Sequence, residues 1–452
     1  MKMVKSLLLG TAAGLVAMSG AQAADLPVKA KPVQYVKICS LYGAGFYYIP
    51  GTDTCIKIGG FVRSEMNFNA GGSFSVLRGN LDDPARNDLL WRSRAVVTFD
   101  VRSQTEYGTL RSYMAGGYQW DNGAGSGVQQ SVAGVPGNNS LNIYRGFIQW
   151  AGFTAGRSVS FFDVFSTPTY SNTTNVWTSD SGGTGINLLG YTAQFGNGFS
   201  ATISLEDGAH RRISGGGAIF SPTAGIAGTT YAGVSWPDAV ANLRVDQSWG
   251  SAQIMGALHY VEALNGLGGT TDEIGWAVGA GLNLNLPMLG ARDTFSVQVA
   301  YAEGAMHYVG SGIGAGAGAM TMATGFPGVT ALAVGVGFDA ALTGPNSLSL
   351  TTGWSVGAGF QHYWTPTLRT SLYGFYGDLD YSAAASPIAC ALASCDWSMW
   401  QIGSRTVWNP VTNLDLSVDI LYNNVDGARI AGADTEIGWL QGMVRAQRNF
   451  YP

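Results

Sequence analysis

The sequence contains few charged residues for its length of 452. Asp, Glu, Lys and Arg make up 12% of the chain, whereas about 25% is usual in a soluble domain. The chain also lacks any uninterrupted run of roughly 20 apolar residues, which a membrane-spanning helix requires. These two absences argue against an ordinary soluble domain and against a helical membrane protein.

Motifs for metal, nucleotide and nucleophile sites are also missing. We find no H-E-x-x-H, no CxxC pair and no P-loop, and the sequence context that a nucleophilic serine needs is not evident. Only four histidines occur, at His210, His259, His307 and His362. We therefore expect no cofactor, no metal ion and no catalytic residue. An outer-membrane hydrolase built on a barrel remains an alternative, which a lipase assay tests.

The N-terminal segment 1–23 has the pattern of a secretory signal peptide. Lys2 and Lys5 precede an apolar stretch, and the small residues Ala21 and Ala23 frame a cleavage site. Removal of this segment leaves 22 basic against 29 acidic residues, a formal charge of −7. This acidic balance argues against nucleic acid as a partner.

Cysteine is scarce but paired. Cys39 lies near Cys55, and Cys390 lies near Cys395. Export makes an oxidising compartment the expected environment. We predict two local disulfides, with free thiols as the alternative.

What the sequence does contain is alternation with a period of two. Within 90–102, Arg92, Arg94 and Arg102 share one parity, while Trp91 and Val97 share the other. A strand of a membrane barrel alternates in this way between lumen and lipid over about ten residues. Sixteen segments show the pattern: 55–68, 89–103, 107–119, 141–150, 153–158, 187–196, 198–206, 239–248, 251–262, 273–286, 293–304, 347–363, 368–380, 397–408, 414–424 and 436–450.

The connections alternate between tight turns and long polar loops, as in an outer-membrane barrel with short periplasmic turns. Aromatic residues gather near the expected strand ends, where an interfacial girdle lies: Trp91, Trp120, Trp150, Trp249, Trp364, Trp408 and Tyr422. The long segments 159–186, 207–238 and 305–346 can fold into or over a pore mouth. We predict an all-β fold, a transmembrane 16-stranded antiparallel β-barrel over 55–452, preceded by a periplasmic segment over 24–54.

The polar parity of the early strands carries an unusual number of arginines. These candidates for a basic pore wall are Arg63, Arg92, Arg94, Arg111, Arg145 and Arg157. Such a wall creates a field that ranks solutes by charge. The opposing charge is expected from Asp163 and Asp180 in the segment 159–186, if that loop folds inward. An outward loop with ordinary surface aspartates is the alternative.

Three stretches give the chain a resemblance to the outer-membrane porins of alphaproteobacteria, typified by rhizobial porins. They are VKICSLYGAGFYYIPGTDTCIKIGGFVR at 36–63, FFDVF at 161–165 and MVRAQRNF at 443–450. The resemblance implies a homotrimer of sixteen-stranded barrels, each narrowed by an inward-folded third extracellular loop with Asp163 and Asp180. It also implies that a Cys39–Cys55 disulfide ties the N-terminal segment to the first strand.

The resemblance further implies passive transport of small hydrophilic solutes and ions across the outer membrane. The expected surroundings are outer-membrane lipid, lipopolysaccharide and the outer-membrane assembly machinery. That machinery often reads a terminal aromatic residue, whereas Pro452 here follows Phe450 and Tyr451, so the signal is expected to be shifted inward.

Two other functions remain open: a channel specific for sugars or small carboxylates, and a closed barrel that serves as an adhesin or phage receptor. The acidic balance of the mature chain favours cations, whereas the arginines favour anions. We predict a weak preference for cations.

Overall fold

The computed structural model describes residues 37–68, 89–121, 138–173, 178–182, 185–212, 219–220, 231–264, 269–310, 319–322, 332–336, 338–344, 346–381, 394–430 and 433–450. The predicted signal peptide lies outside these residues. Cys390 does too, so the second disulfide stays a prediction.

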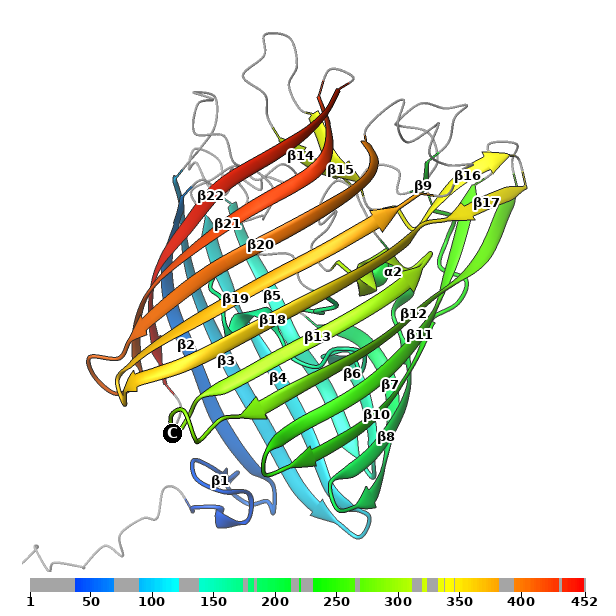
Figure 1. The fold of residues 1–452 in the computed structure, drawn as a ribbon. Coiled ribbons are helices and arrows are strands. Elements are labelled where there is room, and N and C mark those ends of the chain that lie inside the picture. The colour runs from blue at the N-terminus through cyan, green and yellow to red at the C-terminus, as the bar shows by residue number, and fades with distance from the viewer. Residues whose placement is uncertain are drawn as a thin grey trace, which may run out of the picture.

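A single antiparallel sheet of 17 strands dominates the structure, and sixteen of them close into a ring (Figure 1). The remaining strand, β1 (Tyr47–Tyr48), pairs with β2 outside the ring. The ring strands are β2 (Cys55–Phe68), β3 (Leu89–Thr105), β4 (Gly108–Asp121), β5 (Asn138–Trp150), β6 (Phe153–Ser158), β7 (Ile186–Gly196), β8 (Phe199–Glu206), β10 (Asp238–Gln247), β11 (Gly250–Leu264), β12 (Thr270–Asn285), β13 (Thr294–Glu303), β18 (Thr352–Thr365), β19 (Leu368–Asp380), β20 (Ser394–Trp408), β21 (Leu414–Ile430) and β22 (Ala433–Asn449).

Closure comes from the first and last of these strands. Phe61 of β2 pairs with Asn449 of β22, and the register continues to Phe68 opposite Gly442. Every other strand of the ring pairs with the ring strands that come before and after it along the chain, so that β8 pairs with β10 and β13 with β18. The predicted sixteen-stranded antiparallel barrel is therefore confirmed.

One predicted strand is wrong in detail. The pattern over 347–363 predicts a single strand, but the structure breaks it at Thr351, which donates its N–H to Asp339 and accepts from Gly304. The first part is β17 (Ser347–Leu350), which pairs with β16 (Ala340–Gly344). Alternation continues across the break, so periodicity alone does not reveal it.

The long loops carry short elements that the sequence analysis did not predict. Among the described residues these are η2 (Thr167–Thr169), α2 (Gly208–Arg211), β9 (Ile219–Phe220), η3 (Met306–Tyr308), β14 (Ala319–Met322), β15 (Leu332–Val336) and β16. Strands β9 and β14 to β17 lie at one end of the barrel, and β1 and the C-terminus lie at the other (Figure 1).

Two of the tight turns show why the predicted turn residues work. Ala151 and Gly152 join β5 to β6, and Asn197 and Gly198 join β7 to β8. All four residues have positive φ, between 49° and 87°. Positive φ at both central residues matches the right-handed twist of a hairpin, and Asn-Gly adopts it at low cost.

The two faces of the sheet have opposite chemistry. Leu258 and Val278 belong to the outer parity and are exposed, whereas Ser296 and Gln298 belong to the inner parity and are buried. A soluble protein would show the reverse, but lipid favours an apolar exterior. No helix in the described part of the chain is long and apolar enough to cross a membrane.

The seven predicted girdle aromatics are all exposed large side chains. Most lie near strand ends or in a turn, as with Trp150 and Trp408. Tyr422 is the exception, because β21 extends to Ile430 and leaves this residue in the strand interior, where its ring lies 5.4 Å from that of Trp400.

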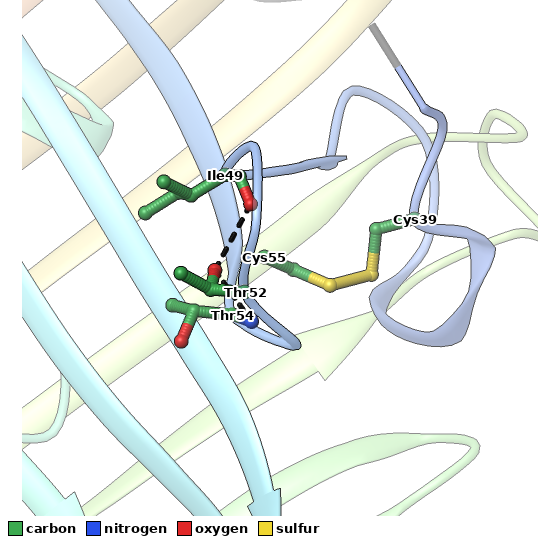
Figure 2. The surroundings of a disulfide bond; sticks show 5 residues. All are labelled: Cys39, Ile49, Thr52, Thr54 and Cys55. Carbon is green, nitrogen blue, oxygen red and sulfur yellow. Dashed lines mark hydrogen bonds between the residues drawn. A yellow bond between two sulfur atoms is a disulfide. The ribbon is translucent and has the colours of Figure 1, made fainter.

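The N-terminal segment is fixed to the barrel by the predicted disulfide between Cys39 and Cys55 (Figure 2). Cys55 is the first residue of β2, and both cysteines are buried with Phe46. The turn before Cys55 is held by the Thr52 hydroxyl, which donates to the Ile49 carbonyl at 3.0 Å.

Candidate pore constriction

Between β6 and β7 lies the segment 159–185, and its described residues, 159–173, 178–182 and 185, pack on the inner face of the barrel wall. Its side chains fill spaces left by wall glycines: a Cβ added at Gly281 would lie 2.6 Å from the Val164 side chain, and one at Gly359 would overlap the Tyr170 ring. We call this segment the third loop. Because it contacts inner-parity residues, it lies inside the ring.

Polar groups of β13 hold the third loop at both its first and its second half. The Gln298 side chain accepts from the Val164 N–H at 3.1 Å and donates to the carbonyls of Thr178 and Ser179 at 3.3 Å. The Tyr170 hydroxyl hydrogen-bonds the Ser296 hydroxyl at 2.6 Å. Both anchors belong to β13, since its inner parity is Ser and Gln at these positions.

The loop then reaches the last strands of the ring. The Asp419 carboxylate accepts from the N–H groups of Asn172 and Thr173. Arg445 donates to the side-chain and backbone oxygens of Asn172, at 2.8 and 2.9 Å. Arg405 donates to the Pro168 carbonyl at 3.0 Å. The described loop thus follows the wall from β10 to β22.

Both predicted loop aspartates are buried. Asp163 accepts from the Ser179 hydroxyl and the Ser181 N–H, each at 2.7 Å, and pairs with Arg211 at 3.5 Å. From the sequence we expect the Asp163 carboxylate to face the solute path, but in the structure it points into the loop, toward Ser179 and Ser181. Its aromatic neighbour Phe162 anchors the loop, since this side chain is fully buried in the main hydrophobic cluster.

Asp180 fixes the fold of the loop in a similar way. Its carboxylate accepts from the Thr167 N–H, the Gly182 N–H and the Ser166 hydroxyl, at 2.8 to 2.9 Å. Burial and the nearby Asp163 raise the pKa of Asp180 above its usual value, against the lowering effect of these hydrogen bonds. The protonated form is therefore favoured compared with an aspartate in water.

Three of the six predicted arginines, Arg63, Arg92 and Arg94, come together on β2 and β3. Two further residues join them, Glu65 and Arg445, which were not predicted as site residues. Arg63 lies directly opposite Arg94, and Arg92 lies opposite Glu65. Glu65 also accepts from Arg445 of β22 at 2.8 Å. We call these five residues the arginine cluster.

Glu65 is shared within this cluster. Besides the bond to Arg445, its carboxylate lies 3.9 Å from Arg63 and 4.0 Å from Arg92. Arg92 has a second partner in Asp121, at 2.6 Å. Ring closure places Glu65 beside Arg445, and this adjacency is the signal that could have found both residues.

The other predicted arginines lie outside the cluster. Arg111 and Arg102 both donate to the Asp100 carboxylate, at distances of 2.7 to 3.0 Å. Arg145 donates to the Gly182 carbonyl of the third loop at 2.8 Å. Arg157 belongs to β6, opposite Gly146 of β5 and Asn187 of β7.

The histidines take part in buried contacts. His259 hydrogen-bonds Asp238 at 2.8 Å, and Asp238 accepts from the Tyr308 hydroxyl at 2.7 Å. His362 hydrogen-bonds Asp293 at 2.6 Å. Burial lowers the pKa of His307 well below its usual value. Among the described residues no group of three or more His, Cys, Asp or Glu side chains could hold a metal ion.

Contrary to the expectation that the sequence offers no nucleophile context, one stretch does match the letters G-x-S-x-G, at Gly353 to Gly357. It lies inside β18, whereas a nucleophile motif of this kind requires a sharp turn from strand to helix. Ser355 is buried, and its hydroxyl donates to Thr178 of the third loop at 2.9 Å. It serves as another anchor of the loop.

The sequence matches the family described as "Porin subfamily" over residues 25–448. The chain belongs to this porin family. Porin Omp2b of Brucella suis biovar 1 (strain 1330) is 35% identical over 263 residues, which cover 57% of this chain and 66% of that porin. Porin Omp2b of Brucella melitensis biotype 1 is 34% identical over the same length.

The fold resembles the outer membrane channel DcaP of Acinetobacter baumannii, with a TM-score of 0.63 and 16% identity, over 89% of this chain and 99% of that one. The resemblance to the alphaproteobacterial porins is confirmed by the family match and the Brucella relatives. Family membership and the barrel place this porin in the outer membrane.

Proposed function

We propose that this porin is a general diffusion channel, which forms a water-filled pore for small hydrophilic solutes and ions. The observation that carries the proposal is the closed ring with a polar inner face and an apolar outer face. Such a ring satisfies its backbone hydrogen bonds in lipid and can surround water. Membership of the porin family indicates a channel rather than an enzyme.

Conductance across a planar bilayer tests this function. Purified porin should produce stepwise currents that scale with salt conductivity, and graded neutral solutes should report the pore size. A folded barrel that inserts but carries no current would instead support the closed receptor or adhesin. Hydrolysis of lipid substrates by the same preparation would support the enzyme alternative.

We further propose that the third loop narrows this pore. Asp163 and Asp180 would act by fixing the course of the loop, since their carboxylates are buried in it. Arg63, Arg92, Arg94, Arg111, Arg145 and Arg157 would form the basic wall. The double variant Asp163→Asn, Asp180→Asn should change conductance, whereas an unchanged conductance would remove both residues from the constriction.

The assembly of this porin is proposed on the family resemblance. Residues 1–23 would be removed, 24–54 would lie in the periplasm, and three copies would form a homotrimer among lipid and lipopolysaccharide. Mass spectrometry should find Ala24 at the mature N-terminus, and native mass measurement in detergent should give three chains. A single chain in mild detergent would contradict the trimer.

A further inference from the structure

Arg63, Arg92 and Arg94 of the cluster lie on β2 and β3, across the ring from the strands that hold the start of the third loop. The cluster residue Arg445 of β22 instead contacts the loop, at Asn172. Strands β2, β3 and β4 are each eight positions from β11, β12 and β13 in the ring of sixteen. The loop residues Phe162 and Val164 pack on β12, near Gly279 and Gly281. A solute that passes Phe162 and Val164 therefore passes between this part of the loop and the side that carries Arg63 and Arg94.

The charges on the two sides of this path are unequal. The cluster and Asp121 contribute four guanidinium groups against two carboxylates, a net charge of +2. Across the path, the carboxylates of Asp163 and Asp180 are buried. Field lines in a narrow aqueous path arise mainly from charges that face the water, so the path is electropositive here.

Within the cluster, Arg63 and Arg94 are the two guanidinium groups whose positive charge is least neutralised by a nearby carboxylate. Arg92 and Arg445 have carboxylate oxygens at 2.6 and 2.8 Å, whereas that of Arg63 is 3.9 Å away. Arg63 and Arg94 are directly opposite each other on adjacent strands, an arrangement of like charges that costs stability. The Arg63 Nε donates to the Gln447 amide oxygen at 2.7 Å. Arg94 donates to the Gln119 amide oxygen at 2.6 and 3.1 Å.

These neutral partners orient the guanidinium groups without cancelling their charge. Gln119 donates its own N–H to Asp121 at 2.9 Å, and Gln447 donates to Asn449 at 2.6 Å, so each amide oxygen is directed at its arginine. Arg63 keeps 17% of its side chain exposed. A planar guanidinium offers paired N–H donors that match a carboxylate or a phosphate.

We propose that Arg63 and Arg94 form a binding station for small oxyanions, carboxylate or phosphate, and give this porin a preference for anions. The inference rests on the proposed pore function and specifies its solutes. It replaces the weak cation preference expected from the acidic balance of the whole chain, because selectivity depends on the charges beside the path.

Reversal potential in a KCl gradient tests the preference. The wild type should give the sign of an anion-preferring pore. The double variant Arg63→Gln, Arg94→Gln should lower the anion-to-cation permeability ratio roughly two- to fivefold, the effect of removing two charges several ångströms away through water. The variant Arg63→Lys, Arg94→Lys should retain most of the ratio.

A control of equal charge change removes two other lumen arginines, which lie near the short turns at the ends of their strands, β10 and β19, and not beside the cluster. Arg244 pairs with Asp246 at 2.8 Å, and Arg369 pairs with Asp415 at 3.7 Å. The variant Arg244→Gln, Arg369→Gln should change the ratio less. A cation-preferring wild type, or equal shifts in the two double variants, would overturn the inference.

Replacing chloride on one side by acetate or by inorganic phosphate distinguishes the two oxyanions. Slowed passage or current block by either anion, lost in the Arg63→Gln, Arg94→Gln variant, would identify the preferred class. Equal behaviour of chloride, acetate and phosphate would refute the binding station. An absence of any current would contradict the pore function itself, so the two failures are distinguishable.

Discussion

At the scale of single residues, Glu65 is the most informative position in the lumen. One buried carboxylate lies within 4.0 Å of three guanidinium groups, from Arg63, Arg92 and Arg445. Removal of one member of a buried ion pair costs far more than an exposed pair contributes, because the remaining charge loses its partner. Glu65 therefore both stabilises the cluster and limits its positive charge.

The variant Glu65→Gln should be less stable and more anion-preferring. We expect a loss of about 3–5 kcal/mol, the usual effect of breaking a buried ion pair, and a reversal potential shifted toward anions. Thermal unfolding in detergent and bilayer recordings measure the two effects. Glu106→Gln, at an exposed turn position, is the control. Equal stability of the two variants would contradict the central role of Glu65.

The two loop aspartates should differ in their response to substitution. Asp163→Asn leaves the fully buried Arg211 guanidinium without this partner, so we expect a loss of about 3–5 kcal/mol at neutral pH. Asp180→Asn replaces a carboxyl group whose pKa is already raised, so the loss should be smaller. Comparison of the unfolding temperatures measures the difference, and the reverse order would be inconsistent with these contacts.

The raised pKa of Asp180 also predicts a dependence on pH. A carboxyl group with a higher pKa in the folded state holds its proton more tightly there, so its contribution is full at low pH and is lost as pH rises through the folded pKa. Relative to Asp180→Asn, the wild type should lose stability as pH is raised from acid to neutral. A temperature difference between the two proteins that stays constant with pH would contradict this.

The face of the sheet on which a side chain lies depends only on its position within the strand. For this reason the sequence predicts the face of the arginines correctly. Arg63, Arg92 and Arg94 fall on the inner face as predicted. The orientation of Asp163 depends instead on Ser179 and Arg211, which are 16 and 48 residues away. No local pattern encodes such contacts, so the burial of this carboxylate could not be predicted.

At the scale of elements, the third loop is defined by the wall beneath it. Phe162, Val164 and Tyr170 occupy space that exists because Gly279, Gly281 and Gly359 have no side chains. The turns and fifteen of the sixteen strands follow from alternation and turn chemistry. The break at Thr351 does not, because it arises from a hydrogen bond to Asp339, 12 residues earlier in the long connection between β13 and β18.

A methyl group at Gly281 should move the loop. Its Cβ would lie 2.6 Å from Val164, so Gly281→Ala should push the loop toward the opposite side and lower the single-channel conductance. At Gly256, on the outer face of β11, the nearest atom would be 3.6 Å away, so Gly256→Ala controls for the added methyl group without any contact with the loop. If both variants conduct like the wild type, the wall glycines do not set the width of the path.

At the scale of the whole molecule, the barrel separates an apolar exterior from a polar interior. The sequence predicts this separation because period-two alternation continues through every strand. It cannot predict which inner residues face water and which lie beneath the third loop. Asn242 and Gln253, for example, are buried because their amides donate to the Phe161 carbonyl.

The same substitution should therefore have opposite consequences on the two faces. Leu258→Arg places a charge on the exposed outer face and should cost about 2–4 kcal/mol near the bilayer midplane. Thr98→Arg, on the inner parity of β3, should cost much less. Urea unfolding from lipid vesicles measures both. Equal losses would contradict the assigned faces.

The bond from Arg445 to Glu65 joins residues 380 positions apart. It can form only after the last strand has been made and has met the first, since no earlier intermediate holds both side chains. In an unfinished barrel, β2 and β22 are therefore unpaired, and the arginine cluster lacks Arg445. If the cluster selects solutes as we propose, that selection is complete only when β22 has closed the ring.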